Sequence, residues 1–81
     1  MKAHVYVMLR NTVLDPQGQT IHGALKKMQY KGVDDVRQGK YFLLTLSDSL
    51  SLPAAQQEVE RISREVLVNP VIEDYTYRLE P

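Results

Sequence analysis

Two cations stand three positions apart in the middle of the chain, in the run Arg37-Gln38-Gly39-Lys40. A guanidinium and an ammonium both bind carboxylate and phosphate oxygens, so this pair predicts contact with an anion or with an acidic partner. Within the predicted hairpin these cations have no obvious acidic partner other than Asp35, and one carboxylate cannot neutralise both of them. The alternative is a structural hairpin with solvated flanks.

The remaining reactive side chains predict no catalytic or metal site. His4 and His22 lack the spacing of metal ligands, and the chain has no cysteine. Asp34-Asp35 and Glu73-Asp74 are adjacent pairs, which a strand would direct to opposite sides, so neither pair suits acid–base catalysis. The glycine-rich phosphate-binding patterns are also absent. We therefore expect no cofactor to bind to this chain.

Periodicity predicts the elements that must position these groups. Apolar and polar residues alternate from Lys2 to Arg10, which is typical of a strand. Two further strands are expected over Val33 to Gln38 and Lys40 to Leu46, joined around Gly39. Val71 to Leu79 is rich in β-branched and aromatic residues and predicts the last strand.

Two amphipathic helices are expected between these strands. The first begins at Asp15-Pro16, where the carboxylate can cap free amides, and Gly32 is its expected stop signal. The second begins at Pro53 and ends before Asn69-Pro70. Both carry apolar residues at helical spacing: Ile21, Ala24, Leu25 and Met28 in the first, and Ala55, Val59, Ile62 and Val66 in the second.

The predicted order is β-α-β-β-α-β, in one domain over residues 1–81. This order predicts an α+β two-layer sandwich, in which two helices cover one face of a mostly antiparallel four-stranded sheet. Hydrophobic residues make up 43% of the chain and charged residues 25%, as in ordinary globular domains.

The other face of this sheet is too apolar for a free monomer. Tyr6 and Met8 would lie on it, with Tyr41 and Leu43 from a neighbouring strand. Leaving several such side chains in water forgoes a few kcal/mol at ~25 cal/mol per Å². We therefore expect a dimer or tetramer, formed through this face or by exchange of a strand between subunits.

Charge and composition limit the compartment and the partners. The net charge is zero, although residues 1–40 hold seven basic and three acidic side chains and residues 41–81 hold the reverse. This balance argues against a nucleic-acid partner, which favours a basic surface. No apolar run is long enough for a membrane helix, and no signal-peptide pattern opens the chain. A cytoplasmic protein is expected.

Three stretches resemble a known family when taken in order. Leu14-Asp15-Pro16-Gln17-Gly18 precedes the first predicted helix, Asp35 to Tyr41 spans the middle hairpin, and Asn69 to Tyr75 enters the last strand. With the Val5-Tyr6-Val7 strand, they resemble PurS, the small subunit of phosphoribosylformylglycinamidine synthase. The resemblance covers essentially the whole chain. Gln38 and Met8 depart from the family pattern, and residues 47–57 match no pattern.

The resemblance implies a part in purine synthesis, in the conversion of formylglycinamide ribonucleotide to the amidine. In the family, a large synthetase subunit (PurL) carries the ATP- and magnesium-dependent chemistry, and a glutaminase subunit (PurQ) releases ammonia from glutamine. PurS is the non-catalytic third component, which forms oligomers and helps to hold the complex together. Arg37, Gly39 and Lys40 would then contact the large subunit or an anion bound there.

Two other classes share the predicted order of elements. An ACT-like regulatory module would bind a small metabolite at a subunit interface, but it is expected to have a glycine-containing loop after the first strand, and residues 10–14 hold no glycine. An acylphosphatase-like hydrolase would need glycines around an N-terminal arginine, and Arg10 lacks them.

Overall fold

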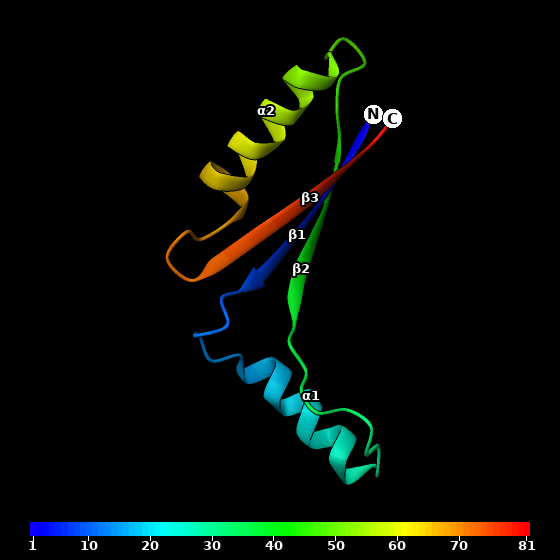
Figure 1. Cartoon of the computed structure of the whole chain (residues 1–81), viewed down its shortest axis with the longest axis vertical. Coiled ribbons are helices and arrows are strands. Elements are labelled where there is room, and N and C mark those ends of the chain that lie inside the picture. Colours follow the sequence, from blue (N-terminus) through cyan, green and yellow to red (C-terminus); the bar gives the residue numbers. More distant parts are fainter.

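The centre of the fold is the strand β1 (Lys2–Leu9), which the alternating pattern predicts. In the computed structural model, which describes residues 1–81, β1 pairs antiparallel with β2 (Gly39–Thr45) on one side and with β3 (Glu73–Glu80) on the other. The strand order is therefore β2-β1-β3 (Figure 1). Both outer strands are open edges of the sheet.

The pairing register divides the sheet into two faces. The inner face carries Ala3, Val5 and Val7, which are at most 1% exposed and form the core with Val59 and Val68. Seven half-buried residues surround this core: Phe42, Leu44, Leu46, Leu67, Tyr75, Tyr77 and Leu79. The outer face carries the alternate residues of each strand, with Tyr6 opposite Tyr41 and His4 opposite Leu43.

The helix α2 (Leu52–Ile62) covers the inner face, as expected, and buries Ala55 and Val59. It continues into a π-helical turn, η1 (Ser63–Leu67), closed by a bond from the amide of Val68 to the carbonyl of Ser63. A π-turn holds one more residue than an α-turn, which rotates the following side chains. The expectation for Val66 is therefore wrong, because this residue is 73% exposed and Leu67 packs against the core.

The helix α1 (Pro16–Lys27) does not pack on the sheet, which corrects the expected sandwich with two helices on one face. It stands beyond the end of the sheet in Figure 1, carried by the segments before and after it. We call residues 10–38 the α1 arm. Its only buried helical residue is Gly18, and the apolar stripe is open, with Ile21 41% and Met28 66% exposed.

The strand predicted over Val33 to Gln38 does not form, so the sheet has three strands instead of four. The order of elements is β-α-β-α-β. This segment returns from α1 to the sheet as irregular chain, and the amide of Gln38 bonds to a side chain instead of a neighbouring strand. The helix also ends before Gly32, because Gln29 takes the left-handed conformation at φ 67°.

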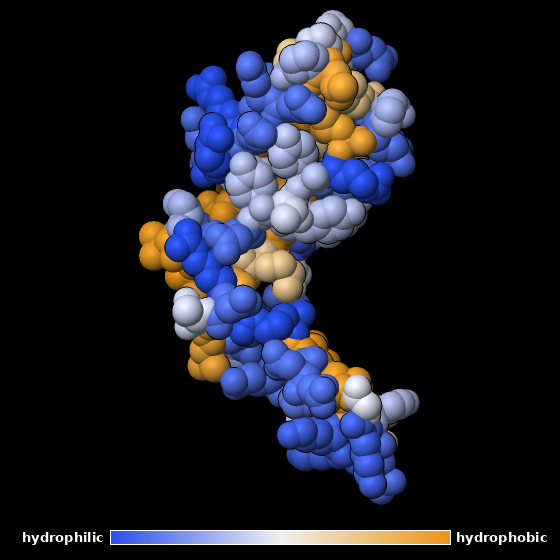
Figure 2. Space-filling model, viewed as in Figure 1, coloured by the Kyte–Doolittle hydropathy of each residue, from blue (hydrophilic) through white to orange (hydrophobic).

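The molecule is long for its size. Its extents are 51 × 26 × 14 Å and its radius of gyration is 16.2 Å, whereas a compact domain of this length has about 12 Å. Figure 2 shows hydrophobic side chains at the surface of both the sheet end and the α1 end. Neither helix has the length and hydrophobicity that a membrane span requires.

Candidate functional site

The three sequence stretches that resemble the PurS family converge where the α1 arm meets the sheet. Asp15 is the N-cap of α1, as predicted, and its carboxylate accepts the amide of Gly18 at 3.0 Å and that of Gln38 at 2.7 Å. These two amide bonds, in that order, and then the charge of Arg37 lower the pKa of Asp15 below its usual 3.8, against the opposing effect of desolvation. The first and second stretches are thereby joined.

Arg37 lies across the segment that leaves β1. Its Nη2 donates to the carbonyl of Arg10 at 3.0 Å and lies 3.3 Å from those of Leu9 and Val13. The two hydrogens of one nitrogen thus serve three carbonyls, so at least one bond is shared. The guanidinium is half-buried and points back into the arm, so the solvated flank of the alternative reading is wrong for Arg37.

Lys40 also has a partner that sequence proximity did not reveal. Its Nζ lies 3.4 Å from Oε2 of Glu73, whose other carboxylate oxygen accepts the amide of Asn69 at 2.8 Å. Glu73 is only 9% exposed, whereas the side chain of Lys40 is 62% exposed. The ion pair joins the second stretch to the third, and Lys40 keeps donors that face solvent.

Gly39 does not form the expected hairpin turn, since it is the first residue of β2. A Cβ at this position would lie 2.5 Å from the carbonyl oxygen of Val7 and 2.1 Å from the sulfur of Met8. Glycine is therefore needed here for the close approach of two backbones. Arg37, Gly39 and Lys40 are brought together, but as parts of a junction.

Arg10 contributes to the same junction, which the sequence did not indicate. Its guanidinium donates to the carbonyl of Pro70 at 2.6 Å and lies 3.4 Å from Asp74. Its amide also bonds to Ile72. The motif of the third stretch, Asn-Pro followed by acidic residues, was the available signal, but it identifies no partner 60 residues away in the chain.

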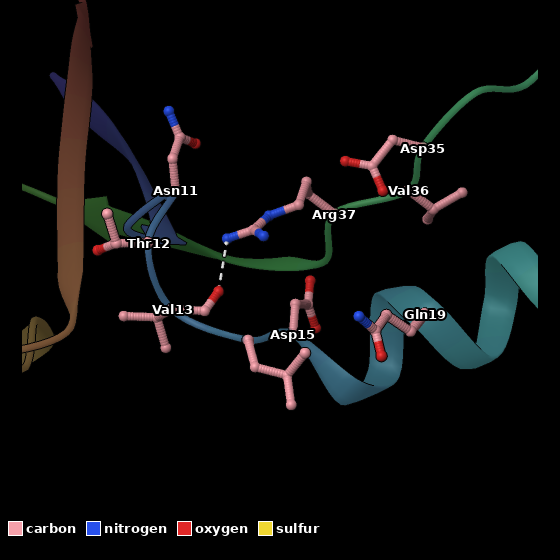
Figure 3. Close-up of a pocket in the computed structure, with 9 residues that line it drawn as sticks. Asn11, Thr12, Val13, Asp15, Gln19, Asp35, Val36 and Arg37 are labelled. Carbon is pink, nitrogen blue, oxygen red and sulfur yellow. Dashed lines mark hydrogen bonds between the residues drawn. The ribbon is translucent and has the colours of Figure 1, made fainter.

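A polar pocket of about 320 Å³ opens beside Arg37 (Figure 3). Asp15 and Asp35 place two carboxylates at its wall, and the other lining residues are Asn11, Thr12, Val13, Leu14, Gln19 and Val36. In Figure 3, the guanidinium of Arg37 reaches across toward the carbonyl of Val13. This arrangement offers polar groups to a partner and ties two chain segments together.

The outer face forms a second candidate surface. Tyr6, Met8, Tyr41 and Leu43 lie on it together, as predicted, and are 39–53% exposed. The rings of Tyr6 and Tyr41 stack at 5.5 Å. His4 also stacks on Tyr41, at 5.8 Å, and shares a hydrogen bond with its hydroxyl. The face is therefore an ordered aromatic cluster that remains open to solvent.

Comparison with known proteins agrees with the resemblance. The family model described as "PurS: Phosphoribosylformylglycinamidine (FGAM) synthase" matches residues 2–81. The PurS subunit of phosphoribosylformylglycinamidine synthase from Mycobacterium leprae is 46% identical over 79 residues, which cover 98% of this chain and 95% of that protein.

Two solved structures have the same fold. Bacillus subtilis PurS superposes with a TM-score of 0.83 at 43% identity, over 99% of this chain and 98% of that one. A chain in the structure of PurLQS from Thermotoga maritima superposes with a TM-score of 0.87 at 34% identity, over 95% of this chain and 93% of that one. With a family match over residues 2–81, the chain belongs to the PurS family of phosphoribosylformylglycinamidine synthase.

Proposed function

We propose that this chain is the non-catalytic small subunit of phosphoribosylformylglycinamidine synthase, a ligase of de novo purine biosynthesis that works in the cytoplasm. Residues 1–81 act as one PurS-like unit, which supports assembly of the large synthetase subunit and the glutaminase subunit. ATP, magnesium and glutamine are used by those partners. The observation that carries the proposal is the likeness to a chain of the Thermotoga maritima PurLQS structure, at a TM-score of 0.87.

The ACT-like alternative rested on the order β-α-β-β-α-β, which this chain lacks.

Reconstitution with the two partner subunits from the same organism tests this proposal. The expected result is co-purification of all three chains, and glutamine-dependent amidine formation that requires this one. The isolated chain should show no ATPase or glutaminase turnover. Full synthase activity of the two partners without it would contradict the assembly role.

A second copy of this chain is the proposed occupant of the exposed apolar surface. The accessible surface is 6044 Å², whereas a monomer of 9.3 kDa is expected to expose about 5,000 Å². The excess of roughly 1,000 Å² is close to the ~800 Å² that each partner buries in a standard interface. The outer face and the open stripe of α1 supply apolar area for a dimer or tetramer, and the open edges of β2 and β3 permit strand exchange.

Sedimentation equilibrium tests self-association, with variants that place a charge on each surface. Ile21→Glu on α1 and Leu43→Glu on the outer face should each shift the wild-type oligomer toward monomer. Gln57→Glu, at an exposed position of α2, is the matched control and should leave the oligomer unchanged. A wild-type particle of 9.3 kDa at micromolar concentration would contradict the proposal.

The segment from Arg37 through Gly39 to Lys40 is the proposed contact with the large subunit or an anion bound to it. Support comes from Lys40, which keeps solvent-facing donors beside its partner Glu73. Lys40→Ala removes an ion pair whose ammonium is exposed, and the buried Glu73 carboxylate keeps its bond from the amide of Asn69, so the folding cost should be about 1 kcal/mol. Binding to the large subunit should weaken, by about 2 kcal/mol if the residue is an anchor of the interface.

Arg37→Ala should weaken the same binding, and both variants are titrated against the large subunit after their melting temperatures have been compared with wild type. Wild-type affinity and wild-type synthase activity in both would remove the segment from the interface.

A further inference from the structure

Within the α1 arm, the helix α1 is joined to the sheet by only two lengths of chain, one on each side of it. Residues 10–15 lead out of β1, and residues 28–38 return to β2. Only Gly18 of the helix is buried. A helix held by two irregular segments would swing freely unless those segments were tied to each other, since loop motions are fast and of large amplitude.

Three independent ties connect the outgoing and returning segments. Asp15, at the end of the first, binds the amide of Gln38 at the end of the second. Arg37 of the second binds the carbonyls of Arg10 and Val13 in the first. Gly18, in the first turn of α1, approaches Val36 so closely that a Cβ on Gly18 would lie 2.3 Å from the carbonyl oxygen of Val36.

We infer that Asp15, Gly18 and Arg37 are positioning residues, which form a rigid joint that fixes the direction of the α1 arm before it docks on a second copy of the chain. The docking half of this inference rests on the proposed self-association. A preset arm strengthens association because less conformational freedom is lost on binding. The joint holds with groups inside one chain, so it exists in the monomer.

Spin-label distances measure the joint directly. The chain has no cysteine, so Lys27→Cys on the arm and Thr45→Cys on β2 give two unique exposed labels. Labelled protein is diluted into an excess of unlabelled wild type, so that only distances within one copy are recorded. We expect a narrow distribution in the background carrying only the labels, and a distribution at least about twice as wide in Gly18→Ala and Arg37→Ala.

Matched variants separate a loosened joint from a damaged helix. Gly23→Ala lies in the same helix with open space around its Cβ and should keep the narrow distribution. Arg37→Lys keeps a nitrogen that can donate to several carbonyls and should restore part of the narrowing. Because the arm lies outside the core, Gly18→Ala should leave the melting of the sheet unchanged. Should Arg37→Ala fail to fold, Asp15→Ala provides the second test.

Sedimentation equilibrium then tests the consequence for docking. Gly18→Ala should raise the dimer dissociation constant by about tenfold, and Gly23→Ala should leave it unchanged. Distance distributions of wild-type width in Gly18→Ala and Arg37→Ala would overturn the joint. Broadened distances with an unchanged dissociation constant would overturn its role in docking. A monomeric wild type would overturn the proposed self-association, while the distance widths would still decide whether the joint exists.

Discussion

The side chains at the base of the arm bind groups that are distant in the sequence, so their sequence neighbours do not reveal their partners. The capping role of Asp15 follows from its place before Pro16 and was predictable. The partners of Arg37 were not, because they are backbone carbonyls 24 to 28 residues earlier in the chain, and every residue has a carbonyl. The partner of Lys40 was not predictable either, because it is Glu73, the first residue of the last strand. Residue types therefore predicted which groups are polar, but not what they bind.

Acid should loosen the arm through Asp15. The pKa of this carboxyl is lowered in the folded chain, so its ionised form stabilises the fold above pH 3.8, and that stability is lost as the pH falls below 3.8 through the folded pKa. We expect far-UV circular dichroism to show partial helix loss in this window. Asn also caps helices, so Asp15→Asn should remove the dependence on acid while keeping part of the helix.

Asp34→Asn is the control for this titration, because Asp34 is exposed and lies outside the joint. It should follow the wild-type acid profile. Identical acid profiles for wild type and Asp15→Asn would show that other carboxylates govern the loss of helix.

At the scale of elements, hydrophobic periodicity located both helices and three of the four expected strands. It failed over residues 33–38, where β-branched Val33 and Val36 suggested a strand but the Gln38 amide is used by Asp15. Periodicity also predicted the apolar stripe of α1 but not what packs against it, because an amphipathic pattern shows only that a face is apolar. Periodicity could not predict the π-turn of η1 either, since the insertion of one residue depends on the packing around the buried Ser63.

Because the π-turn rotates the side chains that follow α2, Val59 and Val66 should lose different amounts of stability when each is truncated. Val59 is fully buried, so Val59→Ala should lower the free energy of unfolding by about 2 kcal/mol, through lost transfer energy and a cavity. That is a large share of the ~4–12 kcal/mol expected for a chain of this length. Urea denaturation measures the loss.

Val66→Ala is the matched control, since an ordinary helix would have placed both valines on one face. At 73% exposure, Val66 should cost no more than about 0.5 kcal/mol on truncation. Comparable losses at the two positions would indicate that α2 runs into the loop without the π-turn.

At the scale of the molecule, five buried residues form a small core beneath a long body. Composition predicted an ordinary domain, yet the chain exposes more surface than a monomer of its mass should. If a second copy covers that surface, stability and association are linked by mass action. The sequence indicated that the outer face exposes apolar side chains in a monomer, but not that the stripe of α1 would expose more.

The melting temperature should therefore depend on protein concentration. Tenfold dilution through the dissociation constant should lower it, because the folded monomer loses the free energy of its interface. Differential scanning calorimetry over a dilution series measures this shift, and Leu43→Glu should melt at one temperature throughout. A concentration-independent wild type would mean that the sheet and α2 alone carry the stability.

The central position of β1 has a consequence for the protein during its synthesis. The first strand made is the middle strand of the sheet, and its register pairs Lys2 with Glu80, so the chain ends lie side by side in Figure 1. A ribosome-bound nascent chain can form α1 and then the β1–β2 pair, but the other edge of β1 begins to pair only when Glu73 emerges and is fully paired only with Glu80. Until β3 has formed, the open edge of β1 is therefore the surface that a nascent-chain chaperone would meet.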